Sequence, residues 1–177
     1  NANTNNAIAP VVVGNLVTFN NVDLSTEMFF TLANTGNTVT CVSDFGSVSA
    51  SWSTVGEWDC ATFPDSTKDA SIVSPHIRIV SDTQSVNNLD IETGASVVVN
   101  ANATLIINGN LSIANTGTLI CDAGSNVIFR GTAGSTQLVD NSSGGNQAFA
   151  NVQISNANNV EFSGGSFSIS EGLHLIN

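Results

Sequence analysis

Histidines close to nucleophiles, paired carboxylates and cysteines are the side chains in this sequence that could do chemistry. The sequence has two histidines, His76 and His174. Ser/His/Asp catalysis needs a histidine within reach of a nucleophile. His76 precedes an alternating strand pattern, however, and His174 takes an outward position in a strand. We therefore expect both histidines at the surface and no catalytic triad.

One pair of carboxylates has a spacing that could serve sugar cleavage. Asp90 and Glu92 are two residues apart in a strand pattern, so their side chains would project from one face about 6–7 Å apart. The counterpart positions one turn further on are Ser112 and Ala114, which add no third acid. A solvated strand face is the simpler interpretation, and we expect no enzyme activity.

Three cysteines leave at least one unpaired. Cys41 and Cys60 lie in the irregular N-terminal third and could form a disulfide in an oxidising compartment, whereas Cys121 lies in an apolar strand pattern and would be a buried free thiol. The alternative is three unpaired thiols. No Cys-x-x-Cys and no calcium-loop pattern is present. We therefore expect no metal and no cofactor.

The charge balance excludes several partners. The 177 residues include 3 Lys+Arg and 14 Asp+Glu, a formal net charge of −11. Nucleic acids and anionic membranes attract basic proteins, and three cations, Lys68, Arg78 and Arg130, are also too few for a patch that binds acidic glycans. No apolar run approaches the roughly 20 residues that cross a bilayer. The Lys-poor, Asn/Ser/Thr/Gly-rich composition is typical of a secreted or surface-exposed β protein.

The chain divides into three parts that differ in composition and in periodicity. Residues 1–50 show short β patterns separated by Asn/Gly turns and no period, and residues 51–69 hold both tryptophans and form an irregular connector. From about residue 70 to 177 the sequence is periodic.

The period comes from three apolar-x-apolar pairs that recur 22 residues later, for example from residue 89 to residue 111. The pairs are Leu89/Ile91 and Leu111/Ile113, Val97/Val99 and Leu119/Cys121, and Leu105/Ile107 and Val127/Phe129. A step of 41 then maps Leu111/Ile113 to Val152/Ile154, because residues 132–150 add a further turn, and a step of 21 leads on to Leu173/Leu175.

Three short strands in turns of about 22 residues predict an all-β fold, a right-handed parallel β-helix in which each strand lies on its counterpart one turn later. A β-sandwich also has short strands every 8–12 residues. It does not predict three faces that repeat with a single offset.

Several motifs follow one another after residue 50. They are Ser51-Trp52-Ser53, Gly56-Glu57-Trp58, Pro64-Asp65, Asp69 to Val73, Val86 to Ala95, Leu105 to Leu111, Gly117-Thr118-Leu119, Asn126 to Gly131, Phe149 to Ile154 and Val160-Glu161-Phe162. Together they resemble the repeat of large secreted surface proteins of Bacteroidetes and are more distantly similar to the eight-glycine β-helical domain. The resemblance covers about residues 51–177. It implies export, a place at the cell surface and a stalk or adhesin-like role, with the tryptophans in a structural cap.

The resemblance also implies a modified residue. Asp65-Ser66-Thr67 fits the Asp-Ser/Thr pattern at which such proteins are similar to one another in carrying O-linked sugars. Ser66 is therefore the candidate glycosylation site of a glycoprotein. A solvated turn is the alternative.

Two functional readings follow. The first is a structural or adhesive module that contacts other chains or further domains of a surface assembly, and the second is a carbohydrate-binding or polysaccharide-active β-helix. The second would need aromatic platforms, and the sequence offers only two tryptophans and no tyrosine. An ice-binding face would need an outward threonine ladder, which the outward positions do not supply.

The pattern makes three structural predictions. First, Leu173 and Leu175 begin a turn with no polar cap, so further turns or a partner strand should follow Asn177. Second, Asn88, Asn110 and Asn151 precede equivalent strands and should form an amide ladder.

Third, four aliphatic side chains should point outward and form a contact patch: Val98, Ile106, Ile120 and Ile128. Leaving them wet would cost several kcal/mol, at roughly 1.5–3 kcal/mol per side chain. We expect either residues 1–50, which would pack on or cap the helix, or another chain to cover this patch.

Overall fold

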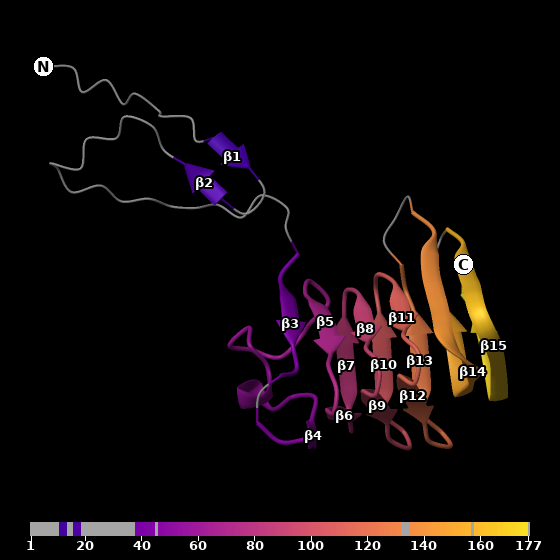
Figure 1. Cartoon of the computed structure of the whole chain (residues 1–177). Coiled ribbons are helices and arrows are strands. Elements are labelled where there is room, and N and C mark those ends of the chain that lie inside the picture. Colours follow the sequence, from indigo (N-terminus) through magenta and orange to yellow (C-terminus); the bar gives the residue numbers. More distant parts are fainter. Residues whose placement is uncertain are drawn as a thin grey trace, which may run out of the picture. The chain divides into compact units, whose positions relative to one another are not determined.

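The computed structural model describes residues 11–13, 16–18, 38–44, 46–131, 135–156 and 158–176 of the chain, in two compact units (Figure 1). The first unit, Asn1–Gly36, contains an antiparallel pair of strands, β1 (Val11–Val13) and β2 (Leu16–Thr18). The second unit, Asn37–Asn177, contains all the other elements.

The second unit is a coil of parallel strands with three faces, of about five turns and roughly 22 residues per turn. Face 1 holds β3 (Thr40–Val42), β5 (Asp69–Ile72), β8 (Leu89–Ile91) and β11 (Leu111–Ile113). Face 2 holds β4 (Ser49–Ser51), β6 (Ile77–Val80), β9 (Ser96–Val99) and β12 (Thr118–Cys121). Face 3 holds β7 (Thr83–Val86), β10 (Thr104–Ile107) and β13 (Asn126–Phe129).

Two long strands, β14 (Gln137–Ile154) and β15 (Val160–Leu175), each continue the stack as an almost complete turn. A single 3-10 turn, η1 (Val55–Glu57), follows β4. The predicted parallel β-helix is confirmed.

The core follows from the alternation of side chains along each strand. In β9, β10 and β13 every second residue is buried, and the buried ones are the apolar members of the predicted pairs, such as Leu105 and Ile107. The register matches the 22-residue offset, with Leu89 opposite Leu111 and Leu105 opposite Val127. Each inward side chain therefore rests on its equivalent one turn earlier.

The predicted step of 41 residues is wrong. Leu111 lies opposite Val139, a step of 28 (111 to 139), and Val152 lies opposite Val127 on face 3, a step of 25 (127 to 152). The physical reason is that the extra residues make one turn of the coil longer. They do not form an additional turn between two turns that keep the same alignment. The final step of 21, from Val152 to Leu173, is confirmed.

The parallel ladder also begins earlier than residue 70. Strand β3 pairs with β5, and β4 pairs with β6. The end of the predicted 1–50 segment is thus part of the coil, and the connector 51–69 completes its first turn. These first strands, Thr40-Cys41-Val42 and Ser49-Ala50-Ser51, lack the apolar-x-apolar pair that shows the period in the sequence.

A ladder of side-chain acceptors climbs one corner of the coil. Asp69 Oδ1 accepts the backbone N–H of Asn88 at 3.0 Å, and Asn88 Oδ1 accepts that of Asn110 at 2.7 Å. Asn110 Oδ1 in turn accepts the N–H of Leu138 at 2.8 Å. The predicted asparagine ladder is therefore correct for Asn88 and Asn110, with backbone groups as the donors.

The prediction is wrong for Asn151. This residue lies opposite Asn126 on face 3, and its amide Nδ2 donates to the Ser125 carbonyl at 3.1 Å. The cause is the same register error, because the lengthened turn moves Asn151 to another face.

Replacement of Asn88 tests the ladder. Asn88→Ala removes the acceptor of the Asn110 N–H and the amide that binds Asp69, so we expect the free energy of unfolding to fall by about 1–3 kcal/mol. Urea denaturation measures the change. The control Asn115→Ala changes an exposed turn residue and should stay within about 0.5 kcal/mol of the wild type. Equal effects of the two substitutions would contradict a role for the ladder.

Candidate functional site

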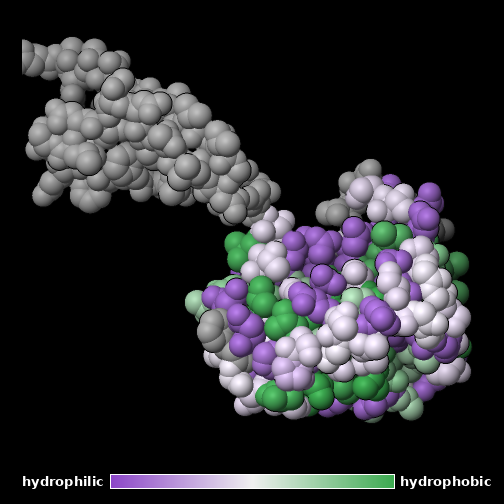
Figure 2. All heavy atoms as spheres, in the orientation of Figure 1, coloured by the Kyte–Doolittle hydropathy of each residue, from purple (hydrophilic) through white to green (hydrophobic). Residues whose placement is uncertain are grey.

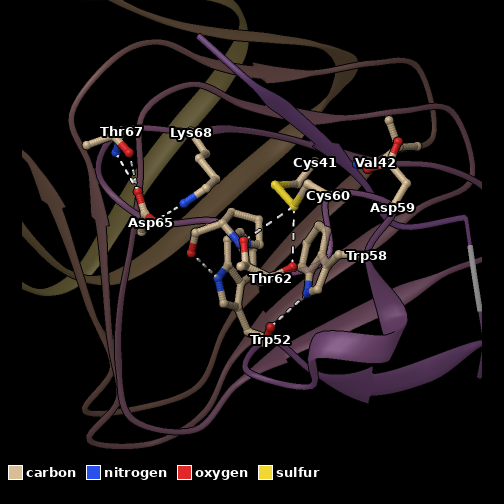
Figure 3. Close-up of a disulfide and its surroundings, with 11 residues drawn as sticks. Cys41, Val42, Trp52, Trp58, Asp59, Cys60, Thr62, Asp65, Thr67 and Lys68 are labelled. Atoms are coloured by element: carbon tan, nitrogen blue, oxygen red, sulfur yellow. Dashed lines mark hydrogen bonds and ion pairs between the residues drawn. A yellow bond between two sulfur atoms is a disulfide. The ribbon is translucent and has the colours of Figure 1, made fainter. Parts of the chain in front are cut away.

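A disulfide links β3 to the connector at the N-terminal turn (Figure 3). The Sγ atoms of Cys41 and Cys60 are bonded at 1.99 Å, and the two Cα atoms are 5.0 Å apart. Of the two arrangements that the sequence left open, the structure contains the disulfide. Closing a loop of 19 residues stabilises a fold by about 3 kcal/mol, mainly through the unfolded chain.

Both tryptophans pack beneath this disulfide, as Figure 3 shows. Trp52 and Trp58 are buried, with ring centroids 5.1 Å apart in an edge-to-face arrangement. Trp58 Nε1 donates to the Trp52 carbonyl at 2.8 Å, and Trp52 Nε1 donates to the Pro64 carbonyl at 3.3 Å. The indoles close the apolar interior and are not available as platforms for a sugar ring.

A buried arginine joins the same cluster. The Arg78 side chain points inward from β6 and is fully buried. Its guanidinium donates to the backbone carbonyls of Ser47 and Glu57, both at 3.2 Å, and of Ser43 at 3.4 Å. It lies 3.5 Å from the Glu57 carboxylate and 5.6 Å from the Trp58 ring centre.

Burial lowers the pKa of Arg78, and the charge of Glu57 opposes that shift. Glu57 also accepts the N–H of Ser47 at 2.8 Å, and a Cβ at Gly46, where φ is +71°, would come within 2.5 Å of that carboxylate. Arg78 and Glu57 thus hold together three segments of the first turn. Sequence reasoning missed this role, although Arg78 shares the inward parity of Val80.

The histidine prediction is half wrong. His174 is exposed, but His76 is buried, because it shares the inward parity of Arg78 and Val80. Its Nδ1 has no hydrogen-bond partner among the residues that the structure describes.

The carboxylate pair lies on the outer side of face 1. One column there contains Ser71, Asp90, Ser112, Asp140 and Ser163 in successive turns. The Ser71 hydroxyl donates to Glu92 at 2.8 Å, and the Ser163 hydroxyl donates to Asp140 at 2.8 Å. Desolvation raises the pKa of Asp90, a hydrogen bond from Ser112 lowers it, and Glu92 raises it. The two acids are therefore engaged with serines of neighbouring turns.

The described residues contain no group of three or more His, Cys, Asp and Glu side chains that could hold a metal ion.

Cys121 is a free cysteine, and burial raises the pKa of its thiol to about 12. Because the thiolate is the nucleophilic form, this shift disfavours reaction of the partly buried Cys121 at neutral pH.

Ser66 is exposed at the tip of a turn. The Asp65 carboxylate shapes this turn by accepting the N–H of Thr67 at 2.9 Å and its hydroxyl at 2.6 Å, and it pairs with Lys68 (Figure 3). The hydrogen bond from Lys68, with that from Thr67, lowers the pKa of Asp65 to about 2.

The four aliphatic side chains of the contact patch point outward. Ile106 lies opposite Ile128 on face 3, and Val98 lies opposite Ile120 on face 2. Ile120 is 47% exposed, and the other three are half-buried. Most of the proposed cover belongs to the separate first unit, of which only residues 11–13 and 16–18 are described, so the cover stays a prediction. Hydrophilic and neutral residues occupy most of the surface seen in Figure 2.

The comparisons with known proteins return nothing: no family model, no curated protein and no solved structure matches the chain. In the described part of the chain no helix is both long and apolar enough to cross a membrane.

Replacement of the buried arginine tests the N-terminal cluster. Arg78→Met removes the ion-pair partner of the Glu57 carboxylate and the donor to several carbonyls, so we expect the free energy of unfolding to fall by about 3–5 kcal/mol. The matched control Arg130→Met changes an exposed arginine and should cost less than about 0.5 kcal/mol. Chemical denaturation of both variants decides the point, and a similar small loss for both would show that Arg78 does not hold the cluster.

Proposed function

We propose that the chain is a structural or adhesive module of a secreted or cell-surface protein, in which the β-helix acts as a rigid stalk or assembly element without enzyme activity. Its partners would be other chains or further domains of a surface assembly, and glycans at the contact surface.

The observation that supports this proposal best is the use of the outward polar side chains. Short serine, aspartate and asparagine side chains bond to the next turn, as in Ser163 to Asp140 and in Asn110 to Leu138. Ser96 and Thr118 do the same on face 2, with their hydroxyl oxygens 2.7 Å apart. Such side chains stiffen the stack and leave few groups converging on a substrate.

The disulfide supports the proposed location. Disulfides persist in oxidising environments outside the cytosol, and Cys41–Cys60 lies in the turn that closes the core. The Lys-poor composition, with 3 Lys+Arg in 177 residues, agrees with an extracellular place.

A combined binding and activity assay tests the function. The oxidised chain is applied to a glycan array and incubated with a panel of acidic and neutral polysaccharides. We expect no release of reducing ends, because the paired acids are bonded to serines. Release of reducing ends that Asp90→Asn abolishes and Arg130→Met preserves would contradict the proposal and support the polysaccharide-active alternative.

We further propose Ser66 as an O-glycosylation site, because its turn presents the hydroxyl to solvent next to Asp65 and Thr67. Chain isolated from its natural source should carry a hexose-containing mass on the peptide that includes Ser66. Intact-peptide mass spectrometry checks this, with Ser66→Ala as the matched control for the site. An unmodified Ser66 peptide from that source would contradict the assignment.

A further inference from the structure

The last turns of the coil are joined differently on face 2 than on the other two faces. On faces 1 and 3, backbone ladders join β14 to β11 and to β13. On face 2, β12 pairs with β9, and no described strand pairs with it on the side of β14. Residues 146–148 of β14, which we call the strap, border a groove of about 290 Å³ together with β12. The strap pairs with β15 on its other side, so the two form one layer over β12.

Side chains connect this layer to the turn below it. Gln147 in the strap is buried, and its Nε2 donates to the Leu119 carbonyl of β12 at 2.5 Å. Glu171 in β15 accepts the backbone N–H of Gly124, in the turn after β12, at 3.0 and 3.1 Å. Glu171 also accepts the amide of Asn151 at 2.8 Å. Two side-chain contacts thus take the place of a backbone ladder on this face.

The free thiol lies beneath the same layer. Cys121 lines the groove from β12, and the backbone N–H of Ala150, two residues after the strap, hydrogen-bonds to its sulfur. Burial raises the pKa of this thiol, while hydrogen bonds from Ser125 and Ala150 oppose the shift. The covered thiol is therefore kept protonated, and removal of its cover would return its pKa toward the ordinary value of a cysteine.

We propose that the strap opens from β12 while the rest of the coil stays folded, and that this local opening makes Cys121 reactive. Segments held by few backbone hydrogen bonds open at a lower free energy than the whole domain. Opening here breaks the Gln147 and Glu171 contacts and leaves the ladders of faces 1 and 3 intact. Because the strap pairs with β15, the neighbouring stretch of β15 moves with it.

The reaction that the open state allows is thiol–disulfide exchange. The Cys121 thiolate attacks one sulfur of a disulfide, a mixed disulfide forms, and the other sulfur leaves as a thiolate. The proton of the thiol goes to solvent. Cys121 is the only free thiol of the three cysteines when Cys41 and Cys60 are bonded, so it reports the opening without an added label site.

The test is labelling of the oxidised chain with dithiobis-nitrobenzoate in increasing urea, at mildly alkaline pH. The coloured thiolate that is released gives the rate, and peptide mass spectrometry shows that the label is on Cys121. At low urea we expect slow labelling whose rate rises only weakly with urea, because a local opening exposes little surface. The opening free energy from these rates should be smaller than the free energy of unfolding measured by urea denaturation.

Two variants loosen the layer. Gln147→Met keeps the side-chain length but donates no hydrogen bond, so we expect labelling about fivefold faster or more. Its matched control is Gln84→Met, a buried glutamine on face 3 whose amide binds Asp82, and it should leave the rate at low urea unchanged.

Glu171→Ala removes the acceptor of the Gly124 N–H at an exposed position, so it should also speed labelling without loss of the fold. The exposed Glu161→Ala in the same strand is its control and should have no effect.

Three results would overturn the proposal. Labelling that follows global unfolding over the whole urea range would show that the strap does not open alone. A rate that neither urea nor Gln147→Met nor Glu171→Ala changes would show that Cys121 reacts in the closed fold. Equal acceleration by Gln147→Met and Gln84→Met, or by Glu171→Ala and Glu161→Ala, would show that the contacts described here do not hold the strap. Circular dichroism confirms that each variant folds.

Discussion

The hydrogen-bonded ladder between successive turns is the constraint on which the rest of the structure depends. Parallel strands stack about 4.8 Å apart, so each side chain has a fixed neighbour above and below. Most inward positions, such as Leu89 and Leu111, are therefore apolar. Outward positions can be filled by short polar side chains that bond to the next turn, such as Ser96 and Thr118. One geometric rule therefore produces both the core and the polar surface.

The first turn is an exception to this rule, because a charged side chain takes an inward position there. Arg78 occupies an inward position where the next turns have Val97 and Leu119. A buried guanidinium is costly unless its donors are satisfied, and its two terminal nitrogens donate to the carbonyls of Ser43, Ser47 and Glu57, in irregular segments, beside the Glu57 carboxylate. The charge is tolerated because these segments are irregular and have carbonyls without strand partners. The same interactions position the connector over the core, next to the disulfide.

Much of the fold could be predicted from the sequence, because short strands with one constant offset place equivalent residues in register. The prediction failed where the offset changed. The 28-residue step from Leu111 to Val139 is invisible to a search for a constant period, and it displaced Asn151 to the wrong face. The inward role of Arg78 was missed because a charged residue suggests the surface, although its parity with Val80 pointed inward. For the candidate site, the cysteine pair could be proposed from its position in the chain. The hydrogen bonds around Glu57 could not, since they join irregular segments that follow no period.

The lengthened turn has a mechanical consequence. On faces 1 and 3, β14 continues the backbone ladder through β11 and β13, but on face 2 no backbone ladder joins β12 to β14 in the described residues. A groove of about 290 Å³ opens there, and the Gln147 side chain bridges it to the Leu119 carbonyl at 2.5 Å. The coil is thus expected to be stiffer along faces 1 and 3, where backbone hydrogen bonds join the turns, than along face 2. Under tension along the coil axis, we therefore expect the turns to separate first on face 2, between β12 and β14.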